Sequence, residues 1–311
     1  MTSMRIFRKQ VFGKLFSAAL VCGLMLTLCS LTSFAQQASD SLTFVNAQWV
    51  VTPLDKGIIL KQFHFTGANK IFDSHQYISI IEIHGKKAKG RFALANDEGK
   101  ITPTSKFAKD SGAVVAMNGT FYNMKVPYNC VCYFKKNGVE AFINNEKMAQ
   151  RDNGAVAISK KGKMSIVPGD MNELGNIPAD QTWARAINAP SVMCSGPMLM
   201  YGGKDARLDE NSFNRNRHPR SAVATKGDIV YLVTVDGRSA EYAQGVSLWE
   251  FTAIMHYLGV EDAINFDGGG STTLYAEGEG EGGIVNHPSD NKKFDRQGER
   301  HVVNALLFIQ K

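Results

Sequence analysis

The chain has 311 residues, 44% of them hydrophobic, with 35 basic and 29 acidic residues and a net charge of +6. This composition is typical of a folded globular protein, and it excludes a disordered or low-complexity chain. No run of Lys or Arg after residue 35 would mark a nucleic-acid groove, so no nucleic-acid partner is expected.

Residues 1–35 have the pattern of a secretory signal peptide. A basic start precedes the apolar run Leu15–Leu31, and small residues lead to a cleavage point after Ala35. An uncleaved membrane anchor is the alternative, because the run is near the shortest length that spans a bilayer. Lipoprotein processing at Cys29 is disfavoured by the bulky Leu28. Cleavage would remove four basic residues and leave 31 against 29 acidic ones, a net charge of +2.

The rest of the chain is predicted to be one α+β domain, residues 36–311, with a mixed, mainly antiparallel β-sheet assembly and a few packed helices. Residues 36–110 form its β-rich N-terminal part, and residues 111–311 carry the motifs. The N-terminal part is predicted to contain strands at Phe44–Val51, Gly57–Phe63 and Tyr77–Ile83, a turn at Thr52–Asp55, and a helix at Thr102–Asp110 capped by Thr104 or Ser105.

Three cysteines follow the predicted signal peptide, Cys130, Cys132 and Cys194. A bridge from Cys194 to either of the other two and three free thiols are equally compatible with the sequence. Their spacing does not match a zinc site. His64, His75 and His84 have no partner at ligand spacing and are interpreted as structural.

Short strands and turns dominate the middle of the chain. Gly196-Pro197 is predicted to be a turn that leads into the apolar strand Met198–Met200. Hairpin turns are predicted at Asn137-Gly138, Asn153-Gly154 and Lys161–Lys163, with a loop at Gly169–Asp180.

Several predicted strands end in polar residues. The apolar strand Ala113–Met117 stops at Asn118-Gly119, which is either a turn or a side-chain amide directed into a site. A hairpin of Ala222–Ala224 and Ile229–Val235 places Arg220 at a sheet, where a guanidinium needs an ion pair or an anion. The second strand ends in Asp236-Gly237-Arg238, which forms either an internal ion pair or part of a site.

The strongest predicted helix covers Ser247–Leu258, with a capping box of Ser247 and Glu250 and a stop at Gly259. Next comes a buried strand that ends before Asp267-Gly268-Gly269-Gly270-Ser271-Thr272-Thr273. Three glycines in a row lose much backbone entropy, so they indicate a tight turn or close approach of a ligand to the main chain. Free N–H groups beside hydroxyls would suit an anion or a sugar. An ordinary hairpin turn is the alternative.

Taken together, these stretches resemble the phosphodiester glycosidase family. The likeness covers about Ala113 to the C-terminus, while Asn118-Gly119-Thr120 departs from the family's frequent Asn-Ala-Gly. It rests, in the family's order, on Asn118-Gly119, Gly196–Leu199, Pro219–Ala222, Val235–Arg238, Ser247–Glu250, Asp267–Thr273, Asn286–Asp290, Glu299-Arg300 and Asn304.

The resemblance implies hydrolysis of a sugar 1-phosphodiester, such as an N-acetylglucosamine 1-phosphodiester, to free sugar and a phosphomonoester. Phosphate leaves readily, so one carboxylate with arginines would suffice. Asp267 or Glu299 is then expected to act as base or nucleophile, Arg220 to bind the phosphodiester and Asp236 to orient an arginine or a sugar hydroxyl. Substrate binding is expected from Asn118, Gly119, Arg238, Gly268, Gly269, Gly270, Ser271, Thr272, Asp290, Arg300 and Asn304.

Two other functions fit the sequence. Asp236, Asp267 and Asp290 could ligate a hard cation in a metal-dependent phosphodiesterase, and the same arginines could serve a non-catalytic module that binds phosphorylated glycans. No cofactor is expected, and a divalent cation is left open. A phosphorylated glycan is the expected partner, the expected location is secreted or periplasmic with no membrane span after cleavage, and the sequence leaves the oligomeric state open.

Overall fold

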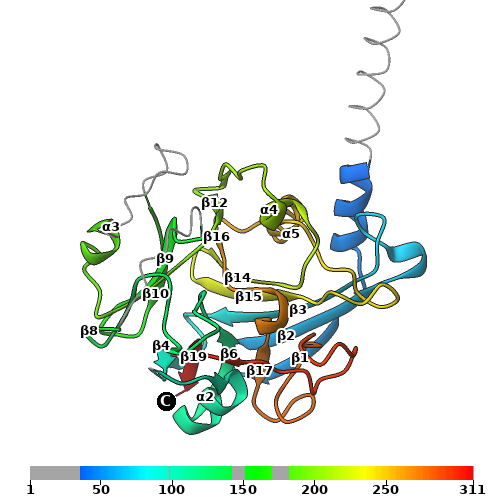
Figure 1. Cartoon of the computed structure of the whole chain (residues 1–311). Coiled ribbons are helices and arrows are strands. Elements are labelled where there is room, and N and C mark those ends of the chain that lie inside the picture. The colour runs from blue at the N-terminus through cyan, green and yellow to red at the C-terminus, as the bar shows by residue number, and fades with distance from the viewer. Residues whose placement is uncertain (1–35, 98, 142–150, 170–181, 311) are drawn as a thin grey trace, which may run out of the picture. The chain divides into compact units, whose positions relative to one another are not determined.

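The computed structural model describes residues 36–97, 99–141, 151–169 and 182–310 (Figure 1). The chain divides into two compact units, Met1–Asn46 and Ala47–Lys311. The predicted signal peptide lies outside the described residues, as does all of the predicted Gly169–Asp180 loop except its first residue. In the described part, no helix combines the length and the apolar character needed to cross a membrane.

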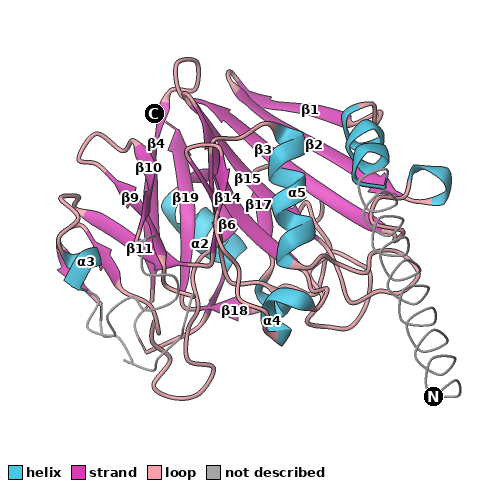
Figure 2. Cartoon of the chain, turned by 90° about the horizontal axis from the view of Figure 1, so that it is seen from above, coloured by secondary structure: helices cyan, strands magenta, loops and turns pink. Residues whose placement is uncertain are grey.

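The unit Ala47–Lys311 is built from antiparallel sheets, which Figure 2 shows with the helices around them. The largest sheet has the order β1-β2-β3-β15-β14-β16-β12-β13. Its strands are β1 (Val50–Asp55), β2 (Ile58–Phe65), β3 (Gln76–His84), β12 (Met198–Tyr201), β13 (Lys204–Asp205), β14 (Arg220–Lys226), β15 (Ile229–Val235) and β16 (Asp262–Asn265).

Three smaller sheets complete the unit, with the orders β10-β9-β11-β7-β8, β17-β6-β19-β4 and β18-β5. Their strands are β4 (Gly90–Asn96), β5 (Thr102–Pro103), β6 (Ala113–Asn118), β7 (Phe134–Lys136), β8 (Val139–Glu140), β9 (Gly154–Ile158), β10 (Met164–Pro168), β11 (Ser191–Ser195), β17 (Leu274–Ala276), β18 (His301–Val302) and β19 (Asn304–Gln310). The helices are η1 (Gly67–Asn69), α2 (Thr104–Ser111), α3 (Thr182–Arg185), α4 (Ser212–Arg215), α5 (Leu248–Leu258) and η2 (Gly269–Ser271). The predicted α+β class with mainly antiparallel strands is therefore confirmed.

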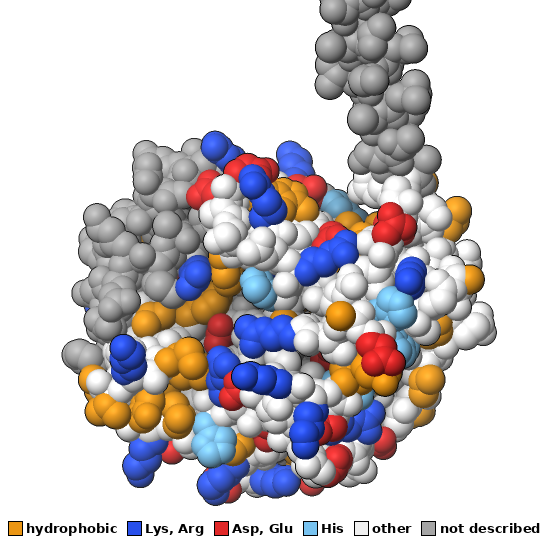
Figure 3. Space-filling model, turned by 45° about the vertical axis from the view of Figure 1, so that its right-hand side comes forward, with side chains coloured by type: hydrophobic (Ala, Val, Ile, Leu, Met, Phe, Trp, Pro, Cys, Tyr) orange, Lys and Arg blue, Asp and Glu red, His pale blue; other side chains and the backbone are white. Residues whose placement is uncertain are grey.

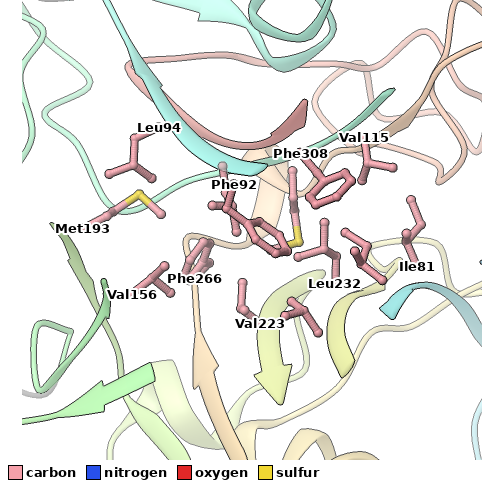
Figure 4. Packing of buried hydrophobic residues seen from close by; sticks show 14 of the residues in the cluster. Ile81, Phe92, Leu94, Val115, Val156, Met193, Val223, Leu232, Phe266 and Phe308 are labelled. Carbon is pink, nitrogen blue, oxygen red and sulfur yellow. The ribbon is translucent and has the colours of Figure 1, made fainter. Parts of the chain in front are cut away.

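The core lies where the inner faces of the sheets meet. Figure 4 shows Phe92 and Phe308 beside each other, with Val223 and Leu232 of the largest sheet opposite and Val156 of β9 at one side. Burial of these side chains stabilises the fold by roughly 1.5–3 kcal/mol each. The core therefore fixes the sheets against one another.

Strands from the predicted N-terminal part pair directly with strands from the motif-bearing part. β3 pairs with β15 along its length, from Ile78 beside Val235 to His84 beside Ile229. β4 pairs in the same way with the C-terminal strand β19. The segment after Asn46 therefore shares its sheets with the later residues.

Several predicted elements are confirmed. α5 begins after Ser247 with both hydrogen bonds of the capping box and ends at Gly259 in the left-handed conformation. The hairpin turns at Asn137-Gly138 and around Gly162 are present, since Gly138 and Gly162 have positive φ between paired strands. β14 and β15 form the predicted hairpin, and Gly196-Pro197 leads into β12.

Three local predictions are wrong. Residues 36–45 are helical, so no strand covers 44–51, and β1 begins only at Val50, where it finds β2 as a partner. Residues 43–45 favour β-structure, but strand propensity depends strongly on the surrounding structure and does not decide the conformation here. Thr52–Asp55 belongs to β1 rather than to a turn. Gly154 begins β9, and the Asn153 side chain accepts a hydrogen bond from the Met198 N–H at 2.7 Å instead of forming a hairpin turn.

The cap of α2 also differs from the prediction. Its N-cap residue is Pro103, and neither Thr104 nor Ser105 caps the helix with its own side chain. The Glu299 carboxylate, almost 200 residues away in sequence, accepts the Ser105 N–H at 2.7 Å and the Ser105 hydroxyl at 2.6 Å. An acidic side chain at a helix N-terminus satisfies a free donor and is favoured by the helix dipole. Of the cysteine alternatives, the structure shows free, buried thiols at Cys130, Cys132 and Cys194.

Candidate active site

Several of the polar residues predicted from sequence lie at the ends of strands from two sheets. Asn118 ends β6 and Asn304 begins the antiparallel β19, so both lie at the same end of the four-stranded sheet. Arg220 begins β14, Asp236 follows β15, and Asp267 comes two residues after β16. Alternating strand direction thus brings residues from five segments of the chain together.

Asn118 joins these strand ends. Its side chain is fully buried, donates to the Asp267 carbonyl at 2.7 Å, and accepts from the Ser221 hydroxyl at 2.8 Å and the Thr273 N–H at 3.1 Å. The Asp267 N–H in turn donates to the Gly119 carbonyl at 3.1 Å. Asn118 therefore forms no hairpin turn; it fixes the loop that carries Asp267.

Most N–H groups of the glycine loop are used within the protein, which corrects the expectation of a nest of free donors. Gly268 donates to the Asp267 carboxylate, Gly269 to the Pro219 carbonyl and Ser271 to the Gly268 carbonyl. The hydroxyls of Thr272 and Thr273 are buried and have no hydrogen-bond partner among the described residues. Such buried polar atoms call for an explanation, and a ligand would supply one.

Asp267 itself is only partly exposed. Burial raises the pKa of its carboxyl above the usual 3.8, while the Ser271 hydroxyl and the Arg300 guanidinium oppose the shift. A raised pKa marks a carboxylate whose charge is poorly solvated and therefore reactive as a base or nucleophile.

Two arginines lie beside the glycine loop. Arg300 donates from Nε to the Asp290 carboxylate at 2.9 Å, and its Nη2 contacts the same oxygen. Arg238 lies against Gly269, and no ion pair or hydrogen bond engages its guanidinium in the described part of the chain. Residue Arg238 is exposed as a whole, but partial desolvation of its guanidinium and the neighbouring Arg300 lower the pKa of Arg238. Figure 3 shows basic and acidic side chains next to one another across the middle of one face.

The contacts of Arg220 do not match the phosphodiester-binding role expected from the sequence. Its side chain is 1% exposed, and its donors bind main-chain carbonyls of Val246, Phe213 and Asn216 at 2.6 to 3.1 Å. Burial lowers the pKa of the guanidinium to about 9, which leaves it charged at neutral pH. Arg220 holds the segment before β14 and the segment before α5 together, and no carboxylate of the described residues forms an ion pair with it.

Asp236 forms no ion pair with Arg238. It accepts from Asn286 Nδ2 at 3.0 Å and from the His287 N–H at 2.9 Å, and it lies 2.8 Å from His287 Nδ1. Asn286 also donates to the Thr272 carbonyl. Asp236 thus connects the 286–290 loop to the glycine loop and orients His287.

The last two predicted site residues make mainly structural contacts. Asn304 accepts from the Thr120 N–H at 2.7 Å and contacts Gly119, which has no room for a side chain. Glu299 lies at the start of α2, as described above, and borders the same surface as Arg300. Both hold segments on which other site residues stand.

Sequence reasoning missed Tyr122 and Arg151. The Tyr122 hydroxyl donates to the His301 carbonyl at 3.0 Å, and burial together with the Asp267 carboxylate raises the pKa of Tyr122. The Arg151 guanidinium stacks on Phe213 at 4.3 Å and lowers the pKa of Asp267. Neither residue belongs to a motif, so only the folded chain reveals that they face Asp267.

The acidic residues are not arranged as metal ligands. Among the described residues, no group of three or more His, Cys, Asp or Glu side chains is placed to hold a metal ion, and this includes the trio Asp236, Asp267 and Asp290. Asp290 is paired with Arg300 and Asp236 with His287.

Gly270→Ala is expected to lower kcat/KM about 10²-fold, the effect typical of a catalytic group displaced by about 1 Å. A Cβ on Gly270 would lie 2.3 Å from Arg300 Nη2 and 2.6 Å from Asp290 Oδ1, so the ion pair must move. Both contacts are ends of flexible side chains, and the melting temperature should change little. Gly268→Ala is the matched control: its Cβ would lie 2.6 Å from the Pro219 carbonyl and should destabilise the fold. Steady-state kinetics beside thermal melts would separate the two, and equal activity of Gly270→Ala and the parent would contradict the prediction.

Comparison with known proteins shows which family the chain resembles. A family model for phosphodiester glycosidases matches residues 111–309. A curated bovine protein named N-acetylglucosamine-1-phosphodiester alpha-N-acetylglucosaminidase is 27% identical over 194 residues, which cover 59% of this chain and 34% of that protein. The chain thus spans about a third of the length of this curated relative.

Two solved structures share the fold. The zebrafish N-acetylglucosamine-1-phosphodiester alpha-N-acetylglucosaminidase catalytic domain, described as auto-inhibited by its pro-peptide, aligns with a TM-score of 0.60 at 19% identity, over 84% of this chain and 85% of that one. A hypothetical protein from Synechocystis aligns with a TM-score of 0.57 at 16% identity, over 85% of this chain and 64% of that one.

Proposed function

The chain belongs to the phosphodiester glycosidase family, and from this premise we propose that it hydrolyses a sugar 1-phosphodiester to free sugar and a phosphomonoester. The substrate class is a phosphate-linked glycan, with an N-acetylglucosamine 1-phosphodiester as the first candidate. No cofactor is assigned to the reaction. The signal-like residues 1–35 support a secreted or periplasmic location.

One observation carries the proposal: a poorly solvated carboxylate, Asp267, lies beside guanidinium groups of which Arg238 is unpaired in the described structure. A phosphodiester is an anion, and planar guanidinium groups bind its oxygens with two donors at once. Arg238 and Arg300 are therefore assigned to the phosphate. Arg220, whose donors bind carbonyls, is assigned to the scaffold.

The chemistry divides between these groups. Asp267 attacks the anomeric carbon, or removes a proton from the water that attacks it, as the bond from this carbon to the phosphate oxygen breaks. The bonding electrons leave with the phosphate, whose growing negative charge Arg238 and Arg300 stabilise. Phosphate is a good leaving group, so the site needs no second carboxylic acid to protonate it. Glu299, bound to Ser105, is not assigned a chemical step.

The test is hydrolysis of an N-acetylglucosamine 1-phosphodiester in oxygen-18 water, with and without EDTA, followed by mass spectrometry. The expected result is label in the sugar, with the rate unchanged by EDTA. Label in the phosphate together with loss of activity in EDTA would establish a metal-dependent phosphodiesterase instead. Binding without turnover would point to a glycan-binding module.

The pH profile of kcat/KM gives a second check. Asp267 must be ionised to act, so activity is lost as pH falls through its pKa, and burial puts the midpoint of this acidic limb above 3.8. Arg300 lowers the pKa of Asp267, so Arg300→Gln should move the limb to still higher pH. A limb at or below 3.8, or one that Arg300→Gln leaves in place, would contradict the assignment.

A further inference from the structure

A cavity lies at the end of the sheets opposite the candidate active site. Strand β14 runs from Arg220, next to the glycine loop, to Lys226, beside the cavity, and its seven residues span about 20 Å. The cavity has a volume of about 400 Å³, which is within the range of small-molecule sites. A small ligand bound there would not reach the residues assigned to catalysis.

Much of the cavity lining is apolar and belongs to the core. Five strands of three sheets contribute Ile83 of β3, Phe92 of β4, Met164 of β10, Val230 of β15 and Phe308 of β19. Figure 4 shows Phe92 and Phe308 beside each other, and their ring centroids are 5.0 Å apart. The cavity is therefore an opening into the core where the three sheets meet. An apolar ligand that covers such side chains removes their surface from water, which favours binding.

Three turns surround the cavity, at residues 85–89 between β3 and β4, 159–163 between β9 and β10, and 226–228 between β14 and β15. Main-chain hydrogen bonds hold these turns in place. The Gly85 N–H donates to the Asp228 carbonyl at 2.8 Å, and the Phe92 N–H donates to the Gly162 carbonyl at 2.9 Å. The cavity is thus preformed, and a ligand needs no rearrangement of the turns.

The same turns carry a dense positive charge. They contain seven exposed lysines and one acidic residue, a net charge of +6, namely Lys86, Lys87, Lys89, Lys160, Lys161, Lys163, Lys226 and Asp228. The Asp228 carboxylate accepts the Lys86 N–H at 3.0 Å and lies 3.9 Å from the Lys86 ammonium. Lys161 and Lys163 line the cavity and form no ion pair within the described part of the chain. Their charges are therefore available to an anion.

We propose that this cavity binds a straight-chain amphiphile with an anionic head, of which a fatty acid is the simplest example. The chain lies against the apolar residues of the core, and the head is held by Lys161 and Lys163 at the rim. The positive potential of the three turns attracts such an anion. A polyanion without a chain would meet the same lysines but would leave the apolar lining in water, so the cavity favours a ligand that has both parts.

The test is calorimetric titration of the full chain with hexanoate, octanoate and decanoate. Each buried methylene contributes roughly fourfold in affinity, so Kd should fall about 10-fold or more for every two carbons added. Decyltrimethylammonium, which has the same chain as decanoate but a cationic head, should bind at least about 10-fold more weakly. Acetate, which has the head without the chain, should give no measurable heat of binding.

Charge reversal locates the site. The double variant Lys161→Glu with Lys163→Glu should weaken decanoate binding about 10-fold, because each reversal replaces an attraction by a repulsion. The matched control is Lys109→Glu with Lys204→Glu, which makes the same change in net charge at exposed lysines outside the cavity lining and should leave Kd unchanged. All four lysines are exposed, so neither double variant should unfold the chain.

Four outcomes would overturn the inference. Affinity that does not depend on chain length would mean that the apolar lining is not used, and equal affinities of the two double variants would place the ligand elsewhere. Binding to phosphatidylglycerol vesicles without binding of decanoate would identify a membrane-surface patch instead of a cavity site. Competition between decanoate and a sugar 1-phosphodiester would place decanoate in the candidate active site.

Discussion

Asp267→Asn is expected to lower kcat/KM about 10⁴-fold or more, as removal of a principal catalytic group does in other hydrolases. The asparagine keeps an oxygen that can accept the Gly268 N–H, now 3.0 Å from the carboxylate, so the loop should keep its shape. What is lost is the charge that attacks carbon or activates water. Single-turnover kinetics with a sugar 1-phosphodiester would measure the loss.

Thermal unfolding of the same variant supplies the control. The pKa of Asp267 is raised in the folded chain, so its ionised form at neutral pH is disfavoured by folding, and this cost grows as pH rises through the raised pKa. Asp267→Asn removes that cost, so the melting temperature at pH 7 should stay the same or rise. A marked fall in melting temperature would mean that the variant loses activity through misfolding, and full activity would mean that Asp267 is not the reacting carboxylate.

The sequence predicts the fold best where short-range signals agree. Ser247, Glu250 and Gly259 define α5 through contacts within a few residues, and β14 and β15 are adjacent in the chain. The prediction failed where a distant partner decides. The α2 helix is the example, because Glu299 from the other end of the sequence caps it.

The candidate site shows the same division. Asp267 and Arg238 stand in motifs whose glycines and charges are visible in sequence. Two residues that shift the pKa of Asp267 or respond to its charge are not visible in the sequence, because Tyr122 and Arg151 come from other segments and approach the loop only in the folded chain. Arg220 is the clearest example. A guanidinium beside apolar residues suggested an anion, and main-chain carbonyls of the α4 region and of the segment before α5 occupy its donors instead.

Arg220→Met should therefore lower stability more than any other substitution considered for this site. Arg220 is the largest fully buried side chain among the described residues, and its removal leaves the carbonyls of Phe213 and Asn216 without this donor, whereas the Val246 carbonyl keeps the His218 N–H at 3.2 Å. Each of the two carbonyls that loses its donor costs about 1–2 kcal/mol, and a chain of this size loses about 2 °C of melting temperature per kcal/mol. The expected fall in melting temperature is thus about 4–8 °C.

Arg238→Met is the comparison that separates a scaffold arginine from a substrate arginine. Arg238 is exposed and has no partner in the described structure, so its loss should leave the melting temperature within about 1 °C, since surface changes usually cost less than about 0.5 kcal/mol. The kcat/KM of the Arg238→Met variant should fall about 10²-fold, which is the usual effect of removing one donor to a developing negative charge. Thermal melts and kinetics of both variants, measured well below either melting temperature, decide between the roles. If the Arg220→Met variant melts at the same temperature as the parent protein but does not hydrolyse the substrate, Arg220 binds the substrate rather than stabilising the fold. Its contacts with the main-chain carbonyls would then contribute little to stability.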